Sequence, residues 1–357
     1  MIYVDSLDEL DDRLASGARS LSGWRLRGLD LSERSAALRS VDVTGALFLG
    51  CLLRSEDGES VRARGAIVFP TIPAVPIDMY RTALYTPQEL YDTDDYSDSL
   101  DARVYAWSQH EDSRDTALAQ ALHDHTLGLA LESWTSSRRL VGVMGGHRAA
   151  RGEHTYADGA RLGRMLAQTF TVATGGGPGA MEAVNLGGYL SDHGEGALDE
   201  ALETLSRVPD FAAHIGDWVQ AAFTVRDRFP RASESLGIPT WHYGHEPPNA
   251  FASAIAKYCR NAQREAILLK VCQAGIVFLP GAAGTVQEIF QDACENYYAD
   301  ESSIAPMVLV GNEYWTERYP AWSLLQALAK GRPMEPHVHL VDTIDEAVEL
   351  MRSGASR

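Results

Sequence analysis

Two glycine-rich turns contain the residues best suited to chemistry. The first reads GGGPGAME over 175–182, and the second reads PGAAGTVQE over 280–288. Each follows a short apolar run and precedes a helix-like stretch, which predicts a strand, a tight turn and a helix N-terminus. Glycine lets the backbone approach an anion, and the first N–H groups of a helix point at it. The two turns therefore predict a phosphate site, and the glutamate closing each turn predicts chemistry beside it.

The second turn is the sharper signal. Pro280 fixes the strand exit, Gly281 and Gly284 free the backbone, and Thr285 adds a hydroxyl at the helix start. Glu288, one turn into the helix, would serve as a complement to the helix dipole if the turn were only structural. A carboxylate beside a phosphate weakens binding, so its presence favours a reaction at the sugar instead.

The first turn also fits a dinucleotide fingerprint. Its pattern is GxGxxA over 175–180, and Asp192 and Glu195 follow at about the distance of a ribose contact. That fingerprint belongs to the first strand–helix turn of a domain, which here is MGGHR over 144–148. NAD(P) binding is therefore the weaker interpretation, and tight turns without a ligand remain an alternative.

Charge and composition limit the function classes. Lys and Arg number 31 against 49 Asp and Glu, a net charge of −18, in a chain of 357 residues that is 45% hydrophobic. This charge argues against a nucleic-acid partner and favours a small nucleotide held by a local site. The N-terminal segment is acidic and lacks a signal-peptide pattern, and no apolar run reaches membrane-spanning length. We expect a cytoplasmic protein with no membrane partner.

Metal binding is not predicted. The four cysteines contain no CxxC pair and are expected to be reduced structural thiols: Cys51, Cys259, Cys272 and Cys294. Three histidine pairs lack a third ligand at metal spacing: His123 with His125, His242 with His245, and His337 with His339. Contact with substrate by His242 or His245 stays open.

The elements that must position the turns alternate regularly after residue 139. We expect strands over 140–144, 170–174, 238–243, 275–279, 307–310 and 338–341. We expect helices over 156–168, 178–190, 250–271, 285–298 and 315–330, a helical pair around 198–229, and a last helix capped by Thr343 and Glu346. This order predicts an α/β fold, a Rossmann-like and mostly parallel sheet with helices on both faces. Both glycine turns then lie at the carboxyl ends of strands, where ligands bind.

Three regions divide the chain. We expect residues 1–110 to form an N-terminal extension domain of unknown role, 111–138 a helical connector, and 139–357 a Rossmann-like domain that binds a nucleotide and contains the predicted catalytic residues. Leucine or small residues recur about every five positions over 26–50, which is typical of either a pentapeptide-type coil or ordinary strands and turns.

The two turns closely resemble the paired GGGxxGxM and PGGxGTxxE motifs of the LOG family, over about 139–352. The family includes cytokinin riboside 5′-monophosphate phosphoribohydrolases and related nucleosidases, formerly mislabelled lysine decarboxylases. The resemblance implies a Rossmann-like fold, usually a homodimer, that hydrolyses the N-glycosidic bond of nucleoside 5′-monophosphates to free base and ribose 5-phosphate. It also implies that neither a metal nor an organic cofactor is needed.

The resemblance assigns roles by position. Glu288 falls on the catalytic glutamate, and Arg264, one residue further from the proline than expected, on its partner arginine, with Arg260 a lesser candidate. The residues matching the binding loops are Gly145, Gly146, Gly176, Gly177, Gly179, Met181, Gly281, Ala282, Ala283, Gly284 and Thr285. The departures are His147 and Arg148 in place of serines, Ala282-Ala283 in place of glycine plus a variable residue, and Gln287 in place of an acidic residue.

These assignments lead to a mechanism and to alternatives. Glu288 would stabilise the oxocarbenium-like transition state or activate the water, while Arg264 would assist the leaving base or grip the phosphate seated on Thr285. Glu182 is either a second carboxylate or a helix N-terminal charge. The alternative function is non-catalytic binding of a nucleotide or phosphorylated cofactor, resembling the molybdenum cofactor carrier proteins; an NAD-linked oxidoreductase is a weaker third.

Overall fold

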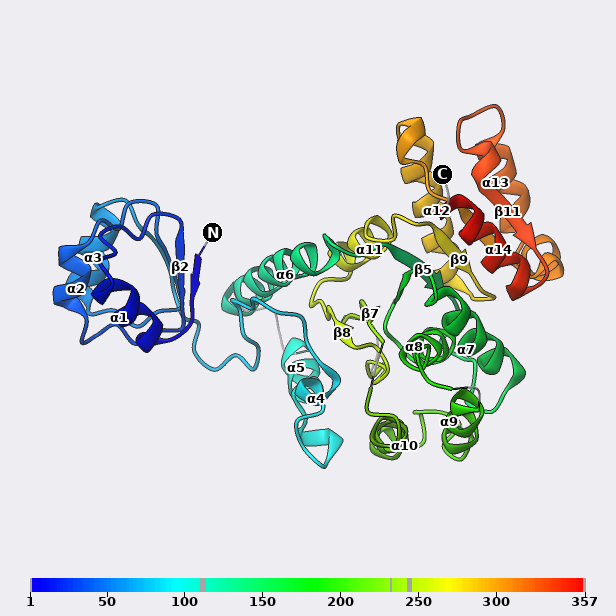
Figure 1. Cartoon of the computed structure of the whole chain (residues 1–357), viewed down its shortest axis with the longest axis horizontal. Coiled ribbons are helices and arrows are strands. Elements are labelled where there is room, and N and C mark those ends of the chain that lie inside the picture. Colours follow the sequence, from blue (N-terminus) through cyan, green and yellow to red (C-terminus); the bar gives the residue numbers. More distant parts are fainter. Residues whose placement is uncertain (1, 110–113, 195, 232, 243–245, 356–357) are drawn as a thin grey trace. The chain divides into compact units, whose positions relative to one another are not determined.

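The computed structural model describes residues 2–109, 114–194, 196–231, 233–242 and 246–355. The chain splits into two compact units, Met1–Tyr80 with Asp112–His123, and Arg81–Glu111 with Asp124–Arg357 (Figure 1). The division differs from the expected boundary at residue 110, because the segment after Tyr80 packs with the larger unit. There Tyr85 exchanges two backbone hydrogen bonds with Ile255, of 2.8 and 2.9 Å.

The smaller unit is a repeat of strand and helix. Its parallel strands lie in chain order, β1 (Ile2–Val4), β2 (Trp24–Arg27), β3 (Leu47–Leu49) and β4 (Ile67–Phe69). They are joined by α1 (Leu7–Ala15), α2 (Ser35–Ser40) and α3 (Ser55–Ala63). The pairings join positions 22, 22 and 20 residues apart. The repeat is therefore one strand and one helix, which differs from a pentapeptide-type coil.

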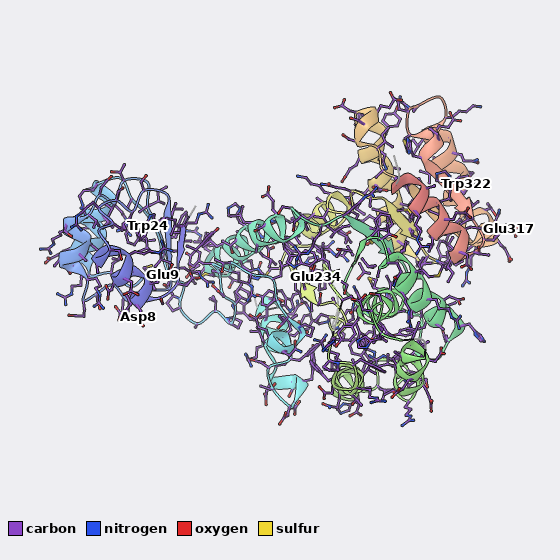
Figure 2. All side chains as sticks on the ribbon, viewed as in Figure 1. Asp8, Glu9, Trp24, Glu234, Glu317 and Trp322 are labelled. Atoms are coloured by element: carbon purple, nitrogen blue, oxygen red, sulfur yellow. The ribbon has the colours of Figure 1, made fainter. Side chains whose placement is uncertain are left out.

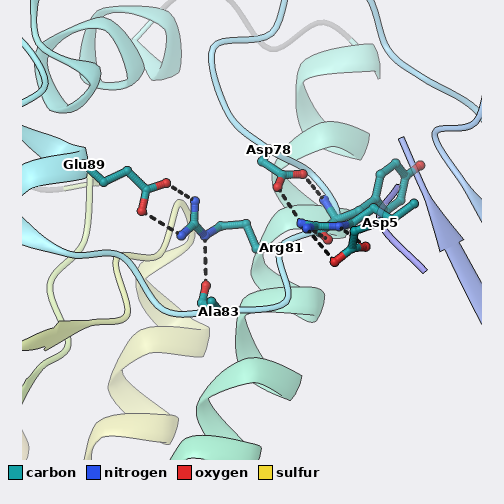
Figure 3. Close-up of polar contacts among 7 residues, drawn as sticks. Asp5, Asp78, Arg81, Ala83 and Glu89 are labelled. Carbon is teal, nitrogen blue, oxygen red and sulfur yellow. Dashed lines mark hydrogen bonds and ion pairs between the residues drawn. The ribbon is translucent and has the colours of Figure 1, made fainter. Parts of the chain in front are cut away.

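The first three strands of the smaller unit each place an apolar residue in the same buried row. Val4 pairs with Leu26 and Leu26 with Phe48, and all three are fully buried. On the polar side, Arg27 donates to Asp5 at 3.0 Å and to Asp78 at 2.9 Å. Figure 3 labels the two aspartates. The side chains that Figure 2 labels in this unit lie on its first helix and second strand, Asp8, Glu9 and Trp24.

The larger unit is built on a seven-stranded parallel sheet, within the residues described, in the order β11-β10-β9-β5-β6-β7-β8. Its strands are β5 (Leu140–Met144), β6 (Thr171–Thr174), β7 (Ser235–Gly237), β8 (Ala254–Ile255), β9 (Ile276–Phe278), β10 (Met307–Val310) and β11 (Val338–Val341). The order reverses direction between β5 and β9, the kind of switch point beyond which ligands bind in open α/β sheets. The predicted Rossmann-like α/β fold is confirmed.

Helices cover both faces of this sheet. The helical segments that follow Tyr80 in the chain are α4 (Pro87–Leu90), η1 (Tyr96–Asp98), α5 (Leu100–Ser108), α6 (Arg114–Thr135), α7 (His154–Leu166), α8 (Ala180–Tyr189), α9 (Ala197–Ser206), α10 (Ile215–Arg228), α11 (Asn261–Lys270), α12 (Ala283–Tyr298), η2 (Glu301–Ser303), η3 (Tyr314–Arg318), α13 (Ala321–Ala329), η4 (Glu335–His337) and α14 (Ile344–Ala355). The part of α6 up to His123 belongs to the smaller unit. On one face, Val141 shares a core with Leu162 of α7 and Val348 of α14. On the other, a Cβ on Gly142 would lie 2.8 Å from Sγ of Cys272, which follows α11.

Three predicted elements are corrected. The strand expected over 238–243 is β7, which ends at Gly237, and Tyr243 lies outside the described residues. The helix expected over 250–271 begins only at Asn261, because the apolar run before it forms the buried strand β8, and a short buried run looks alike in strand and helix. The helix expected over 315–330 is interrupted by Pro320, which has no N–H to donate.

The segment after Tyr80 is fastened to the sheet by buried polar contacts. Asp101 of α5 accepts hydrogen bonds from Nζ of Lys257 at 2.6 Å and from the Trp241 indole at 2.8 Å. Within the segment itself, Arg81 forms a two-pronged pair with Glu89 (Figure 3), at 2.6 and 3.0 Å. The contacts of Asp101 join the segment to the larger unit. None of the helices within the described ranges is long and apolar enough to cross a membrane.

Candidate functional site

Three glycine turns meet at the carboxyl ends of β5, β6 and β9. The N–H of Gly146 donates to the carbonyl oxygen of Pro280, and the N–H of Ala180 donates to that of Gly146, both at 3.1 Å. A Cβ on Gly281 would lie 3.0 Å from N of Gly146 and 2.1 Å from Oγ1 of Thr285. Only glycine permits this approach, so the turns predicted separately from sequence form one continuous surface.

The first glycine-rich turn needs its glycines for backbone shape. Gly176 and Gly179 have φ of 73° and 72°, and a Cβ on Gly179 would lie 2.5 Å from the backbone of His147. Asn249 holds the turn from outside: its N–H donates to Gly176 O at 2.8 Å and its Nδ2 to Gly177 O at 3.1 Å. Sequence reasoning missed Asn249, since no local pattern marks it.

The second glycine-rich turn leads into the N-terminus of α12. Ala282, the residue before the helix, has φ of −100°, so it avoids the left-handed region that would require glycine. Thr285 is buried beneath the turn, and the hydroxyl of Tyr314 donates to Gly281 O at 3.0 Å. The first N–H groups of a helix lack partners within it and attract anions. The turn is therefore suited to a phosphate group despite its two alanines.

Arg264 and Glu288 are both buried and lie close together. The distance between Nη1 of Arg264 and Oε1 of Glu288 is 3.7 Å. Each guanidinium nitrogen also has a protein acceptor: Nε donates to Ile238 O at 2.7 Å, Nη2 to Gly175 O at 3.3 Å, and Nη1 to Glu265 Oε1 at 2.8 Å. Arg264 thus ties the ends of β6 and β7 to the carboxylates. This arrangement favours an anchoring role over a grip on phosphate.

Burial raises the pKa of two carboxyl groups of α12, Glu288 and Asp292. It raises the pKa of Glu288 to about 7; Arg264 opposes this rise and Glu265 adds to it. One turn further along, burial raises the pKa of Asp292 to about 8, with a smaller contribution from Glu295. A carboxyl group with a pKa near 7 can gain and lose a proton at neutral pH, as a general base must.

A cavity of about 1340 Å³ opens over these loops. The predicted site residues that line it are Gly145, Gly146, Gly177, Met181, Arg264, Gly281, Ala282, Ala283, Gly284, Thr285 and Glu288. Gly176 and Gly179 do not line the cavity but shape the turn beneath it. His147 and Arg148, at the expected serine positions, line it too, and Nδ1 of His147 lies 3.6 Å from Oε1 of Glu246.

Some candidate residues do not belong to the site. Glu182 forms a buried ion pair with Arg151, and the Arg151 guanidinium also lies 4.5 Å from the ring centre of Trp218. The role of Glu182 is therefore structural. Arg260 and His242 are not among the lining residues, and His245 lies outside the described part of the chain.

Sequence reasoning also missed residues that do line the cavity. Glu265 is adjacent to Arg264 in sequence and buried beside it. On another wall the rings of Tyr314 and Tyr319 stack at 5.4 Å, with Arg318 between them in sequence. The π-helical turn η3 brings them there, and such turns are frequent at functional sites. Spacing alone does not reveal a π-helical turn.

Fold and site together define a Rossmann-like α/β protein with a cavity at the switch point of its sheet. No protein-family model matches the chain, and no curated protein matches it either. Among solved structures it is similar to one titled as the X-ray structure of TM1055, a structural genomics target. The identity is 17% and the TM-score 0.35, over 59% of this chain and 98% of that one.

Proposed function

We propose that the larger unit hydrolyses the N-glycosidic bond of nucleoside 5′-monophosphates, releasing free base and ribose 5-phosphate. The observation that carries this proposal is that one helix, α12, holds both a candidate phosphate site and a candidate general base. The N-terminus of α12 bears the glycine turn suited to phosphate, and Glu288, with a pKa of about 7, lies one turn further along and lines the same cavity. Phosphate and reacting sugar would then be placed by a single rigid element.

The chemistry follows from that placement. The 5′-phosphate binds the first N–H groups of α12 and Thr285, which brings C1′ of the ribose towards Glu288. The bond from C1′ to the base breaks and its electron pair leaves with the base, while a water oxygen forms the new bond to C1′. Glu288 takes the proton of that water and passes it to the leaving base, which restores the carboxylate. Nearby carboxylate charge stabilises the cationic sugar in the transition state.

Arg264 contributes as an anchor in this scheme. Its hydrogen bonds to Ile238 O and Gly175 O fix the guanidinium, and the fixed guanidinium holds Glu288 at 3.7 Å. The positive charge limits how far burial raises the pKa of Glu288, so the carboxylate form remains accessible at neutral pH.

A second candidate is binding without turnover, of a nucleotide or a larger phosphorylated cofactor. The size of the cavity favours it, because about 1340 Å³ exceeds the roughly 300–1,000 Å³ typical of small-molecule sites. The stacked Tyr314 and Tyr319 add an aromatic wall on which a further ring would pack.

One experiment separates the two. The purified chain is incubated with AMP, GMP, CMP, UMP, IMP and N6-isopentenyl-AMP, and free base is measured by chromatography. Glu288→Gln is the test variant, and Glu349→Gln, an exposed glutamate of α14, is the matched control. Base release by the control but not by Glu288→Gln supports the hydrolase. Nucleotide binding by all forms, with no base released by any, supports the carrier.

A further inference from the structure

Glu265 of α11 has one carboxylate oxygen in use and one without a partner. Its Oε1 accepts the 2.8 Å hydrogen bond from Nη1 of Arg264. Its Oε2 is buried and has no hydrogen-bond partner among the described residues. The side chain is about nine-tenths buried and lines the cavity that also contains Glu288.

A buried carboxylate oxygen without a donor is unfavourable unless something else supplies one. The phosphate of a nucleotide offers no donor at neutral pH and would be repelled by the negative charge. The ribose hydroxyl groups are donors, and they lie near the bond that breaks. Arg264 lies between the two carboxylates, 2.8 Å from Glu265 and 3.7 Å from Glu288, so both can face one sugar ring.

We propose that Glu265 is a second substrate-contacting carboxylate, whose Oε2 accepts a hydrogen bond from the 2′-hydroxyl of the ribose and thereby selects ribonucleotides over deoxyribonucleotides. This inference rests on the proposed function. Positive charge on the sugar in the transition state makes its hydroxyl groups better donors, so the contact strengthens as the glycosidic bond breaks. Glu288 handles the water, and Glu265 holds the sugar.

The test combines changes in the substrate with changes in the protein and compares their effects on kcat/KM. The kcat/KM for AMP, 2′-deoxy-AMP and 3′-deoxy-AMP is measured for the unmodified chain, Glu265→Gln and the Glu349→Gln control. We expect Glu265→Gln to lower kcat/KM for AMP about 10- to 100-fold, the range of a hydrogen bond to a charged group. For the analogue that lacks the contacted hydroxyl we expect little further loss. An equal loss for all three substrates overturns the proposal, because it shows that Glu265 acts only through Arg264.

A binding measurement keeps this test independent of turnover. Calorimetry gives the Kd of ribose 5-phosphate and of 2-deoxyribose 5-phosphate, with Glu265→Asp as a second variant should Glu265→Gln not fold. A preference for ribose 5-phosphate that the variants lose supports the sugar contact even if no base is released, in which case only the hydrolase proposal fails. Equal affinity for the two sugar phosphates, or no binding of either by the unmodified chain, overturns the sugar contact.

Discussion

Arg264 lies 3.7 Å from Glu288, and its guanidinium is held by groups at the ends of two other strands. The pair therefore links the second glycine turn, through α12, to β6 and β7. Replacing Arg264 changes both the fold around the site and the charge on Glu288, and the two effects can be measured apart.

Arg264→Ala removes the positive charge between two buried carboxylates. Because an uncompensated buried charge is left behind, we expect the free energy of unfolding to fall by about 3–5 kcal/mol. The pKa of Glu288 should rise further, since Arg264 is what lowers it. Chemical denaturation near neutral pH measures the first effect. An unfolding free energy within 1 kcal/mol of the unmodified chain (about the scale of an exposed pair) would contradict the buried ion pair.

The stability of the larger unit should decrease as pH rises. The pKa of Glu288 is raised from 4.5 to about 7 in the folded chain, so the folded state keeps a proton that the unfolded state releases. Its stabilisation is complete below about pH 4.5 and is lost as pH rises to about 7, a change on the order of 3 kcal/mol. Denaturation series at pH 5, 6, 7 and 8 measure this slope. Glu288→Gln should flatten it, leaving the part due to Asp292; an unchanged slope would refute the shift.

The rate of base release should also depend on the protonation of Glu288, but it should rise with pH whereas the stability falls. A general base must be ionised, so kcat/KM for base release is expected to rise with pH through about 7 and then level off. The pH profile of initial rates with a ribonucleotide is the measurement. A profile that falls across this range would identify Glu288 as an acid instead.

Gly281→Ala should disrupt the second glycine turn, the proposed phosphate site. The added Cβ would lie 2.1 Å from Oγ1 of Thr285 and 3.0 Å from N of Gly146, so the turn must shift. We expect at least a tenfold weaker Kd for ribose 5-phosphate by calorimetry, about 1.4 kcal/mol or more. Gly188→Ala on α8 is the matched control, because its Cβ would find ordinary contacts at 3.6–3.8 Å. Equal affinities for the two variants would count against the turn as a phosphate site.

Asn249→Ala tests the support of the first glycine turn. The change leaves the carbonyl oxygen of Gly177 without its 3.1 Å donor and removes the contact with Asn185. We expect a loss of about 1–3 kcal/mol in unfolding free energy, typical of a buried polar group left unpaired. Thermal and chemical denaturation measure it, and a neutral result would show that the turn holds its shape by itself.

Local patterns in the sequence determined the order of strands and helices around both glycine turns, and hence the fold class. They also determined that Glu288 follows the second turn on a helix, because a helix start is encoded within a few residues. Residues of both turns line the cavity.

Only the tertiary structure decided how the parts of the site meet. Asn249 contacts Gly177, which is distant in the chain, and no short pattern encodes the burial of Glu265 Oε2. The apolar run before Asn261 became a strand because a neighbouring strand was there to pair with it. The acceptors around Arg264 come from β6 and β7, which adjoin only after the sheet forms. Hydrogen bonds between distant segments, and the burial of side chains among them, form only in the folded chain. The local spacing of residues therefore does not predict them.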